Sequence, residues 1–72
     1  MEEQKLLEIF GLNLKFARIK LKMSQEELAE KVDCTKSYIS NVENAKHNLS
    51  LVNAYKFAKV LNVTLEELLT EK

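Results

Sequence analysis

Five polar side chains between residues 36 and 44 recur at intervals of three and four, the spacing that places side chains on one face of a helix. They are Lys36, Ser37, Ser40, Asn41 and Asn44. A lysine can donate to guanine O6 and N7, an asparagine can pair with adenine N6 and N7, and a serine can donate or accept. This segment therefore carries side chains that can read the edges of nucleic-acid bases.

Residue types that serve other chemistry are scarce in these 72 residues. The chain has one cysteine, Cys34, one histidine, His47, and one glycine, Gly11. A lone cysteine forms no internal disulfide and no clustered set of zinc ligands, and a single glycine cannot build a phosphate-binding loop. We therefore expect no enzyme activity, no metal and no cofactor, and we interpret Cys34 as a core side chain rather than a redox sensor.

The sequence predicts neither a membrane anchor nor a secretory leader. No stretch approaches the ~18 apolar residues of a membrane span, and the acidic amino terminus has no uninterrupted apolar run of secretory length. Together with the unpaired cysteine, these features predict a cytoplasmic chain.

The composition predicts one all-α domain over residues 1–72. The chain is 46% hydrophobic. Because it has no proline and one glycine, it is poor in the turn residues that hairpins need. In four places an apolar residue precedes Ser or Thr, and a second apolar residue stands four positions later, which is the hydrophobic staple of a helix start. These are Met23-Ser24 with Leu28, Cys34-Thr35 with Ile39, Leu49-Ser50 with Ala54, and Val63-Thr64 with Leu68.

From these starts we predict helices near residues 4–21, 25–32, 36–44, 51–61 and 65–70. Glu27 and Glu67 complete capping boxes with Ser24 and Thr64. Asp33 and Asn62 stand where a left-handed residue would end a helix. In the first helix the predicted core stripe is Leu6, Leu7, Phe10, Leu14, Ala17 and Leu21, and Gly11 is expected to be a tolerated interruption.

The segment 25–44, QEELAEKVDCTKSYISNVEN, pairs two of these helices across a turn of three residues. The apolar side chains that would hold the pair together include Leu28, Ile39 and Val42. Ala29 is small enough for two helices to cross closely at a steep angle. The segment therefore predicts a helix-turn-helix whose second helix carries the five polar side chains on its outward side.

These strings resemble the lambda repressor and Cro-like helix-turn-helix proteins, the XRE family, which includes phage-type repressors and restriction-modification controller proteins. The resemblance covers roughly residues 10–69 and rests on SQEELAEKV, YISNVEN, NLSL, AYKFAKVLNV and a closing LEELL. It implies a compact five-helix domain whose third helix enters the DNA major groove. Lys22, Asp33 and Ala45 stand where the family often has glycine, and Leu49 where proline is common, so we expect looser turns there.

The resemblance also implies roles for single residues. The positions that match base-reading ones are Lys36, Ser37, Asn41 and Asn44, with Asn41 as the main specificity residue; the alternative is a merely solvated helix face. Gln25 resembles the family's phosphate clamp, and from their own placement the other residues expected to contact DNA phosphates are Tyr38, Ser40, Lys46 and His47. For His47 the alternatives are an ordinary exposed loop side chain and a minor-groove contact. Arg18 and Glu43 match a family ion pair between the first and third helices, the alternative being two unrelated surface charges.

The formal net charge of zero conceals a segregated distribution. Residues 12–59 carry nine basic and five acidic side chains, a net charge of +4, whereas residues 1–11 and 60–72 carry −2 each. A basic middle of modest charge suits DNA binding with moderate salt dependence and the use of two half-sites. We therefore expect a homodimer.

A second apolar stripe on the first helix runs nearly opposite the first one, through Ile9, Leu12, Phe16 and Ile19. Two apolar faces need two partners. Either the last helix covers this stripe within the chain, or another subunit does. By resemblance to controller-like relatives, the residues expected in a dimer interface are Tyr55, Leu65 and Leu69.

The sequence thus predicts a dimeric, sequence-specific DNA-binding transcription regulator that inserts the helix of residues 36–44 into a two-fold related operator, with no small-molecule ligand. The alternative is a protein-interaction module, such as an antitoxin, for which DNA binding is secondary. An exposed apolar stripe beyond the dimer patch would favour that alternative. A nonspecific nucleoid protein is disfavoured by the zero net charge and by Asn41 at a reading position.

Overall fold

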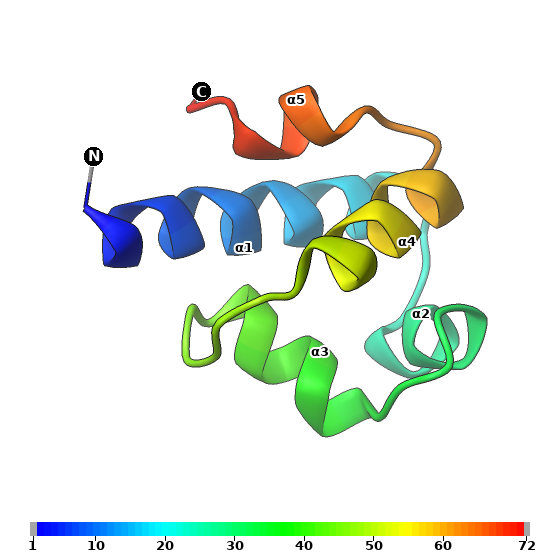
Figure 1. Cartoon of the computed structure of the whole chain (residues 1–72). Coiled ribbons are helices and arrows are strands. Elements are labelled where there is room, and N and C mark those ends of the chain that lie inside the picture. Colours follow the sequence, from blue (N-terminus) through cyan, green and yellow to red (C-terminus); the bar gives the residue numbers. More distant parts are fainter. Residues whose placement is uncertain (1, 72) are drawn as a thin grey trace.

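A computed structural model describes residues 2–71 and contains five helices in that range (Figure 1). They are α1 (Glu3–Lys20), α2 (Gln25–Lys31), α3 (Lys36–Glu43), α4 (Leu51–Leu61) and α5 (Leu65–Leu69). No strand occurs among the described residues, and every helix boundary lies within one residue of its predicted position. The all-α prediction is confirmed.

The four predicted N-caps all form. The hydroxyl groups accept a hydrogen bond from the backbone N–H three residues later, which is the first-turn donor that would otherwise lack a partner. The four caps are Ser24, Thr35, Ser50 and Thr64. Glu27 and Glu67 complete the two predicted capping boxes. Each cap stabilises its helix by about 1 kcal/mol, so these starts are fixed by local chemistry.

The first four helices end at residues with positive φ, at Lys22, Asp33, Ala45 and Asn62. After each of them the next N–H donates to the carbonyl five positions back, as in Met23 to Arg18 (3.1 Å). This is the Schellman arrangement, and it confirms the predicted stops at Asp33 and Asn62. The expectation of looser turns at the glycine-like positions was wrong, because the left-handed geometry is retained without glycine.

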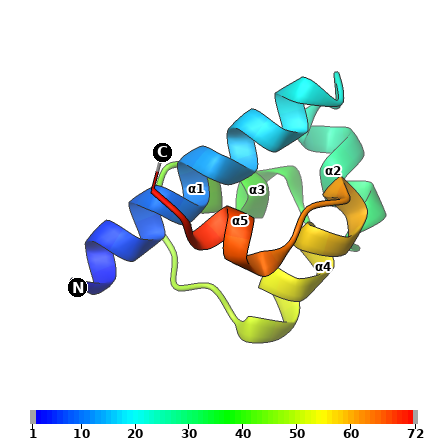
Figure 2. The ribbon, with the colours of Figure 1, turned by 90° about the horizontal axis from the view of Figure 1, so that it is seen from above.

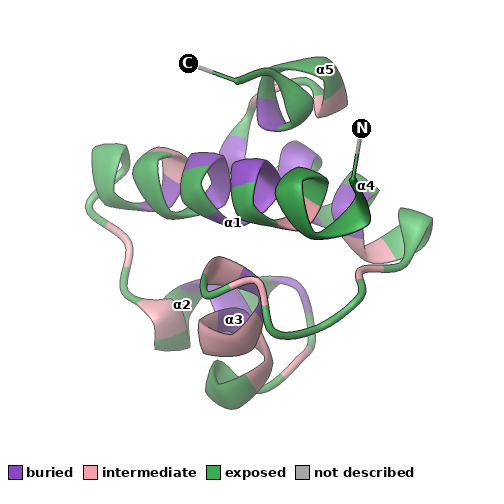
Figure 3. Ribbon diagram, turned by 90° about the vertical axis from the view of Figure 1, so that its left-hand side faces the viewer, coloured by how far each residue is buried: buried purple, intermediate pink, exposed green. Residues whose placement is uncertain are grey.

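The core surrounds α1, with α5 on one side of that helix and α2 and α3 on the other (Figures 1 and 3). Its most completely buried side chains, below 2% exposure, are Leu14, Leu28, Ile39, Phe57 and Leu68, one from each helix. Phe10 and Leu14 of the predicted stripe are buried. Leu6 and Leu21 are exposed, contrary to prediction, because they lie near the two ends of the helix.

Gly11 marks the closest approach between α1 and the carboxyl end of α3. A Cβ atom at this position would lie 2.5 Å from the Val42 carbonyl oxygen and 2.8 Å from that of Glu43. Both are backbone atoms, so no side-chain rotation relieves the overlap. Gly11 is therefore a requirement of the helix crossing, and its interpretation as a tolerated interruption was wrong.

Asn13 attaches α5 to α1, where Figure 2 shows the two helices side by side. The Asn13 side chain is buried, and its Nδ2 donates to the carbonyl oxygens of Leu68 (3.0 Å) and Thr70 (2.8 Å). Both carbonyl groups lie at the carboxyl end of α5, a helix of five residues. The last carbonyl groups of a helix have no N–H donor within the helix itself. One amide therefore satisfies the end of α5, a role that the sequence pattern does not reveal.

Candidate nucleic-acid interface

The helices α2 and α3 pack against each other, and this packing determines which side of α3 faces outward. Leu28 and Ala29 of α2 are buried against Ile39 and Val42 of α3. Ala29, at 4% exposure, leaves room for the crossing as its small size predicts. Because Ile39 and Val42 face the core, the side chains between them on the helix face outward.

A buried ion pair fixes the carboxyl end of α3 to α1. Arg18 Nε donates to Glu43 Oε2 at 2.7 Å and Arg18 Nη2 to Glu43 Oε1 at 3.1 Å, a bidentate contact between side chains that are 11% and 3% exposed. Arg18 Nη1 also donates to the Met23 carbonyl at 2.8 Å. Gln25 Nε2 donates to Glu43 Oε1 at 3.0 Å, so three elements meet at one carboxylate.

The Gln25 contact bears on its expected role as a phosphate clamp. One of its two amide hydrogens is directed to Glu43, which leaves the other hydrogen and the oxygen for a further partner. The side chain is half-buried at the first position of α2. A clamp built this way would be held in place by Glu43.

The five polar side chains of α3 lie on the side opposite its core face. Lys36, Ser37 and Asn44 are exposed, and Ser40 and Asn41 are half-buried. Asn44 Nδ2 lies 3.4 Å from Ser40 Oγ, a weak link along the face. The arrangement presents one cationic donor at the start of α3 and amides towards its end, which suits hydrogen bonding to base edges.

The loop after α3 is tied to this face by His47. Asn41 Nδ2 lies 3.1 Å from His47 Nε2, and the imidazole stacks on the Tyr38 ring with centroids 6.3 Å apart and planes at 20°. Tyr38 in turn accepts a hydrogen bond from Asn53 Nδ2 of α4 at 2.9 Å. The sequence signalled none of these contacts, because they join three elements.

The exposed Lys36 and Lys46 lie near the two ends of α3. The acidic Glu66 and Glu67 belong to α5, on the opposite side of α1 (Figures 1 and 3). The acidic carboxyl-terminal helix is thus separated in space from α3.

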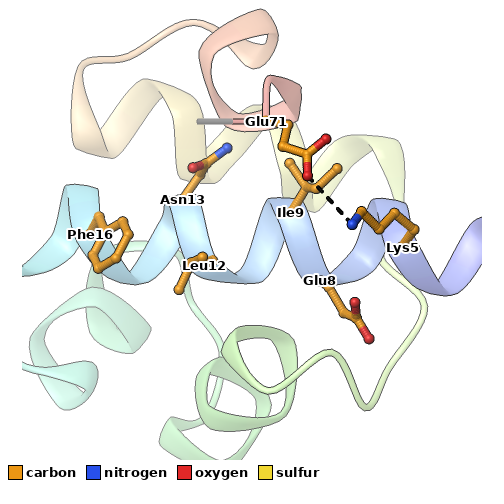
Figure 4. Close-up of a pocket in the computed structure, with 7 residues that line it drawn as sticks. All are labelled: Lys5, Glu8, Ile9, Leu12, Asn13, Phe16 and Glu71. Atoms are coloured by element: carbon orange, nitrogen blue, oxygen red, sulfur yellow. Dashed lines mark ion pairs between the residues drawn. The ribbon is translucent and has the colours of Figure 1, made fainter.

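The second stripe of α1 is only partly covered. Ile9 is buried, whereas Leu12, Phe16 and Ile19 are each 51% exposed; we call these three the α1 patch. Figure 4 shows Leu12 and Phe16 beside a shallow hollow that the Lys5–Glu71 ion pair (3.4 Å) closes at one end. Of the two alternatives left open by the sequence, coverage of the whole stripe by α5 is contradicted, because only Ile9 of the stripe's four side chains is buried.

A second exposed apolar surface lies on α4 and α5. Tyr55 and Leu69 are exposed, and Leu65 is half-buried against the core. Two neighbouring apolar side chains that the sequence pattern did not single out are also exposed, Leu51 at 77% and Val52 at 63%. We call these five residues the α4–α5 patch. The adjacent Leu51 and Val52 in the sequence were the signal that could have indicated an apolar surface at the start of α4.

Cys34 is half-buried and packs against the core next to the α2–α3 turn. Burial raises the pKa of its thiol, and the nearby Asp33 raises it further. A raised pKa keeps the sulfur as the unreactive thiol. The placement suits the staple role.

Comparison with known proteins assigns the family. Residues 14–68 match the family described as helix-turn-helix. The chain belongs to this family. The resemblance to XRE-type proteins inferred from the sequence is thereby confirmed, and this helix-turn-helix protein is a member of a family of DNA-binding transcription regulators.

Individual relatives agree with this helix-turn-helix assignment. The chain is 43% identical to the control protein C.MunI of Mycoplasma sp over 86% of this chain and 85% of that protein. The crystal structure of the restriction-modification controller protein C.AhdI from Aeromonas hydrophila superposes with a TM-score of 0.82 at 39% identity, covering 86% of this chain and 94% of that one. SinR, solved in complex with DNA and described as the master regulator for biofilm formation, superposes with a TM-score of 0.78 at 37% sequence identity. The match covers 85% of this chain and 98% of that one.

Within residues 2–71, no group of three or more histidine, cysteine or acidic residues could hold a metal ion. In the same range no helix is long and apolar enough to cross a membrane.

Proposed function

We propose that this helix-turn-helix protein is a sequence-specific transcription regulator that inserts α3 into the major groove of a two-fold related operator as a homodimer. The single observation that carries the proposal is the outward polar face of α3, held by the buried Arg18–Glu43 pair. A reading helix must keep a fixed angle to the rest of the domain, and this bidentate contact supplies that constraint.

The proposed contacts follow from the placement of each side chain. Lys36, Ser37, Asn41 and Asn44 read base edges, with Asn41 as the principal specificity residue. The phosphate contacts come from residues around this face, which are Gln25, Tyr38, Ser40, Lys46 and His47. Gln25 does so while bound to Glu43, and Tyr38 while bound to Asn53.

The α4–α5 patch is the proposed dimer interface. An apolar surface that includes Leu51, Val52 and Tyr55 is costly to leave in water, and a two-fold contact would bury it in both subunits. Such a dimer would present two copies of α3 about 34 Å apart, one turn of DNA. The relatives named as controller proteins, and SinR in complex with DNA, support a DNA-binding regulator of this kind.

The test is titration of the protein onto duplex DNA from the region directly upstream of its own gene. We expect saturable binding of two chains per duplex, measured by fluorescence anisotropy and by sedimentation. Asn41→Ala should weaken this binding by about tenfold, while affinity for random duplex stays unchanged. Equal wild-type affinity for the upstream and random duplexes would remove the sequence-specific function.

A specific observation also favours a second candidate, a protein-interaction module. The α1 patch is exposed and lies apart from the α4–α5 patch and from α3. If partner binding is the main task, the upstream duplex should be bound no better than random DNA. Phe16→Glu should then abolish binding of the partner while the DNA affinity stays at its wild-type value.

A further inference from the structure

We propose that His47 is a positioning residue that sets which way the Asn41 amide faces, and thereby which base Asn41 reads. The inference rests on the proposed function, because it requires α3 to read DNA. It differs from the phosphate contact expected for His47, since here the imidazole acts through Asn41.

The imidazole is held firmly enough to orient an amide. His47 stacks on Tyr38, and the Tyr38 ring stacks on Phe57 with centroids 6.4 Å apart and planes at 19°. Phe57 is 1% exposed, so this stack connects the loop to the core. Asn53 donates to the Tyr38 hydroxyl at 2.9 Å and restrains the tyrosine from α4. These contacts together favour the observed position of the imidazole beside Asn41.

The chemistry of the 3.1 Å contact determines the face that Asn41 shows to DNA. The Asn41 amide nitrogen faces His47 Nε2, and an amide nitrogen only donates, so we assign Nε2 as the acceptor of this contact. One Asn41 amide hydrogen is then directed to His47. The other hydrogen and Oδ1 remain free side by side, which is the donor–acceptor pair that matches adenine N7 and N6.

Protonation of His47 would reverse this orientation. An imidazolium donates from both ring nitrogens and cannot accept from Asn41. The amide would rotate so that Oδ1 accepts from His47 Nε2–H, and both amide hydrogens would face the DNA. Two donors match guanine N7 and O6 rather than adenine. The base that Asn41 prefers would therefore depend on the charge of His47.

The groups around His47 come from its own loop, from α3 and from α4. Its charged neighbour in the loop is Lys46, α3 contributes the phenol of Tyr38 and the neutral Asn41, and α4 contributes Asn53 behind the tyrosine. Neither ion pair found within residues 2–71 includes His47. Histidine side chains change charge between about pH 5 and 8, so pH is the experimental control.

The test is selection of binding sites from a pool of random duplexes by the wild-type protein at about pH 8 and about pH 5.5, followed by sequencing. The base pair that Asn41 reads is the one whose base preference disappears in Asn41→Ala. At the higher pH we expect adenine to be enriched about tenfold over guanine at this base pair. At the lower pH that preference should fall below about twofold or reverse. His47→Phe, which keeps the stack on Tyr38 but has no acceptor, should show the weak preference at both pH values.

Two controls separate the possible failures. Asn48→Ala changes an exposed neighbour in the same loop and should retain the wild-type preference and its pH dependence. Thermal unfolding of each variant at both pH values verifies that the fold persists. A wild-type protein that enriches no sequence contradicts the proposed function itself. Enrichment that is identical in wild type and His47→Phe at both pH values overturns only the role of His47.

Discussion

At the scale of single residues, two contacts determine where α3 sits. Gly11 lets the end of α3 approach the α1 backbone, and Arg18 binds Glu43 at the same end. The pattern of the family anticipated the ion pair, whereas nothing in the local sequence around Gly11 reveals its partner. Val42 and Glu43 are more than thirty positions away, so only the packed structure shows the need for glycine.

Gly11→Ala should lower the free energy of unfolding by about 2 kcal/mol. Alanine favours a helix by about 1 kcal/mol over glycine, but overlap with two carbonyl oxygens forces the helices apart, which costs more. Urea unfolding measures the difference. Lys15→Ala, on the exposed side of α1, should change stability by less than about 0.5 kcal/mol. A Gly11→Ala protein as stable as wild type would contradict the crossing described here.

Glu43→Gln should lower the free energy of unfolding by about 2 to 4 kcal/mol, since it leaves the Arg18 guanidinium buried without its counter-charge. Chemical unfolding at neutral pH provides the value. Lys5→Gln is the matched control, because it breaks an ion pair whose side chains are 53% and 63% exposed. That change should cost at most about 0.5 kcal/mol. Equal losses of unfolding free energy in Glu43→Gln and Lys5→Gln would show that burial of an ion pair does not change its contribution to stability.

At the scale of the elements, the sequence predicted helix starts and ends within one residue because both depend on neighbours in the chain. A cap hydroxyl and the backbone N–H that donates to it are three residues apart, and a Schellman turn spans six residues. The attachment of α5 by Asn13 and of the loop by His47 could not be predicted in this way. Their partners come from other elements, and an isolated asparagine or histidine has no pattern.

Ala45→Gly should raise the free energy of unfolding by about 0.5 to 1 kcal/mol. Ala45 ends α3 at a φ of 59°, where its Cβ is strained and glycine is not. Thermal unfolding monitored by circular dichroism measures the gain. Ala17→Gly, within α1, should instead destabilise by about 1 kcal/mol. Destabilisation by both substitutions would mean that the left-handed turn carries no strain.

The Glu27 cap of α2 should make stability depend on pH. Hydrogen bonds from the Ser24 backbone and side chain hold the pKa of the Glu27 carboxyl below its usual 4.5. A lowered pKa in the folded state contributes stability that is present above pH 4.5 and is lost as the pH falls through that value and the folded pKa. The free energy of unfolding of Glu27→Gln should therefore differ from that of wild type at neutral pH, and the two values should converge in acid.

Equilibrium unfolding at a series of pH values measures this dependence for wild type and Glu27→Gln. Glu26→Gln is the matched control, since it removes a carboxylate one position earlier that does not form the capping box. A stability difference between wild type and Glu27→Gln that is the same at every pH would rule out the cap as its source.

At the scale of the whole molecule, the fold separates part of the acidic charge from α3. The acidic α5 lies across α1 from the polar face of α3, so the helix proposed to meet DNA is remote from those carboxylates. From the sequence alone, this separation could be predicted only as a net charge for each segment. Which side chains of the second α1 stripe are buried depended on how α5 packs across α1, and periodicity could not predict that packing.

At the same scale, α3 is proposed to read DNA sequence through Asn41. The measurement that tests it most directly is the ratio of dissociation constants for a scrambled duplex and for the duplex enriched from a random pool, at one salt concentration. For wild type this ratio should exceed about 100, and Asn41→Ala should lower it about tenfold without changing the affinity for the scrambled duplex. A wild-type ratio near one, or a ratio that Asn41→Ala leaves unchanged, would contradict the claim.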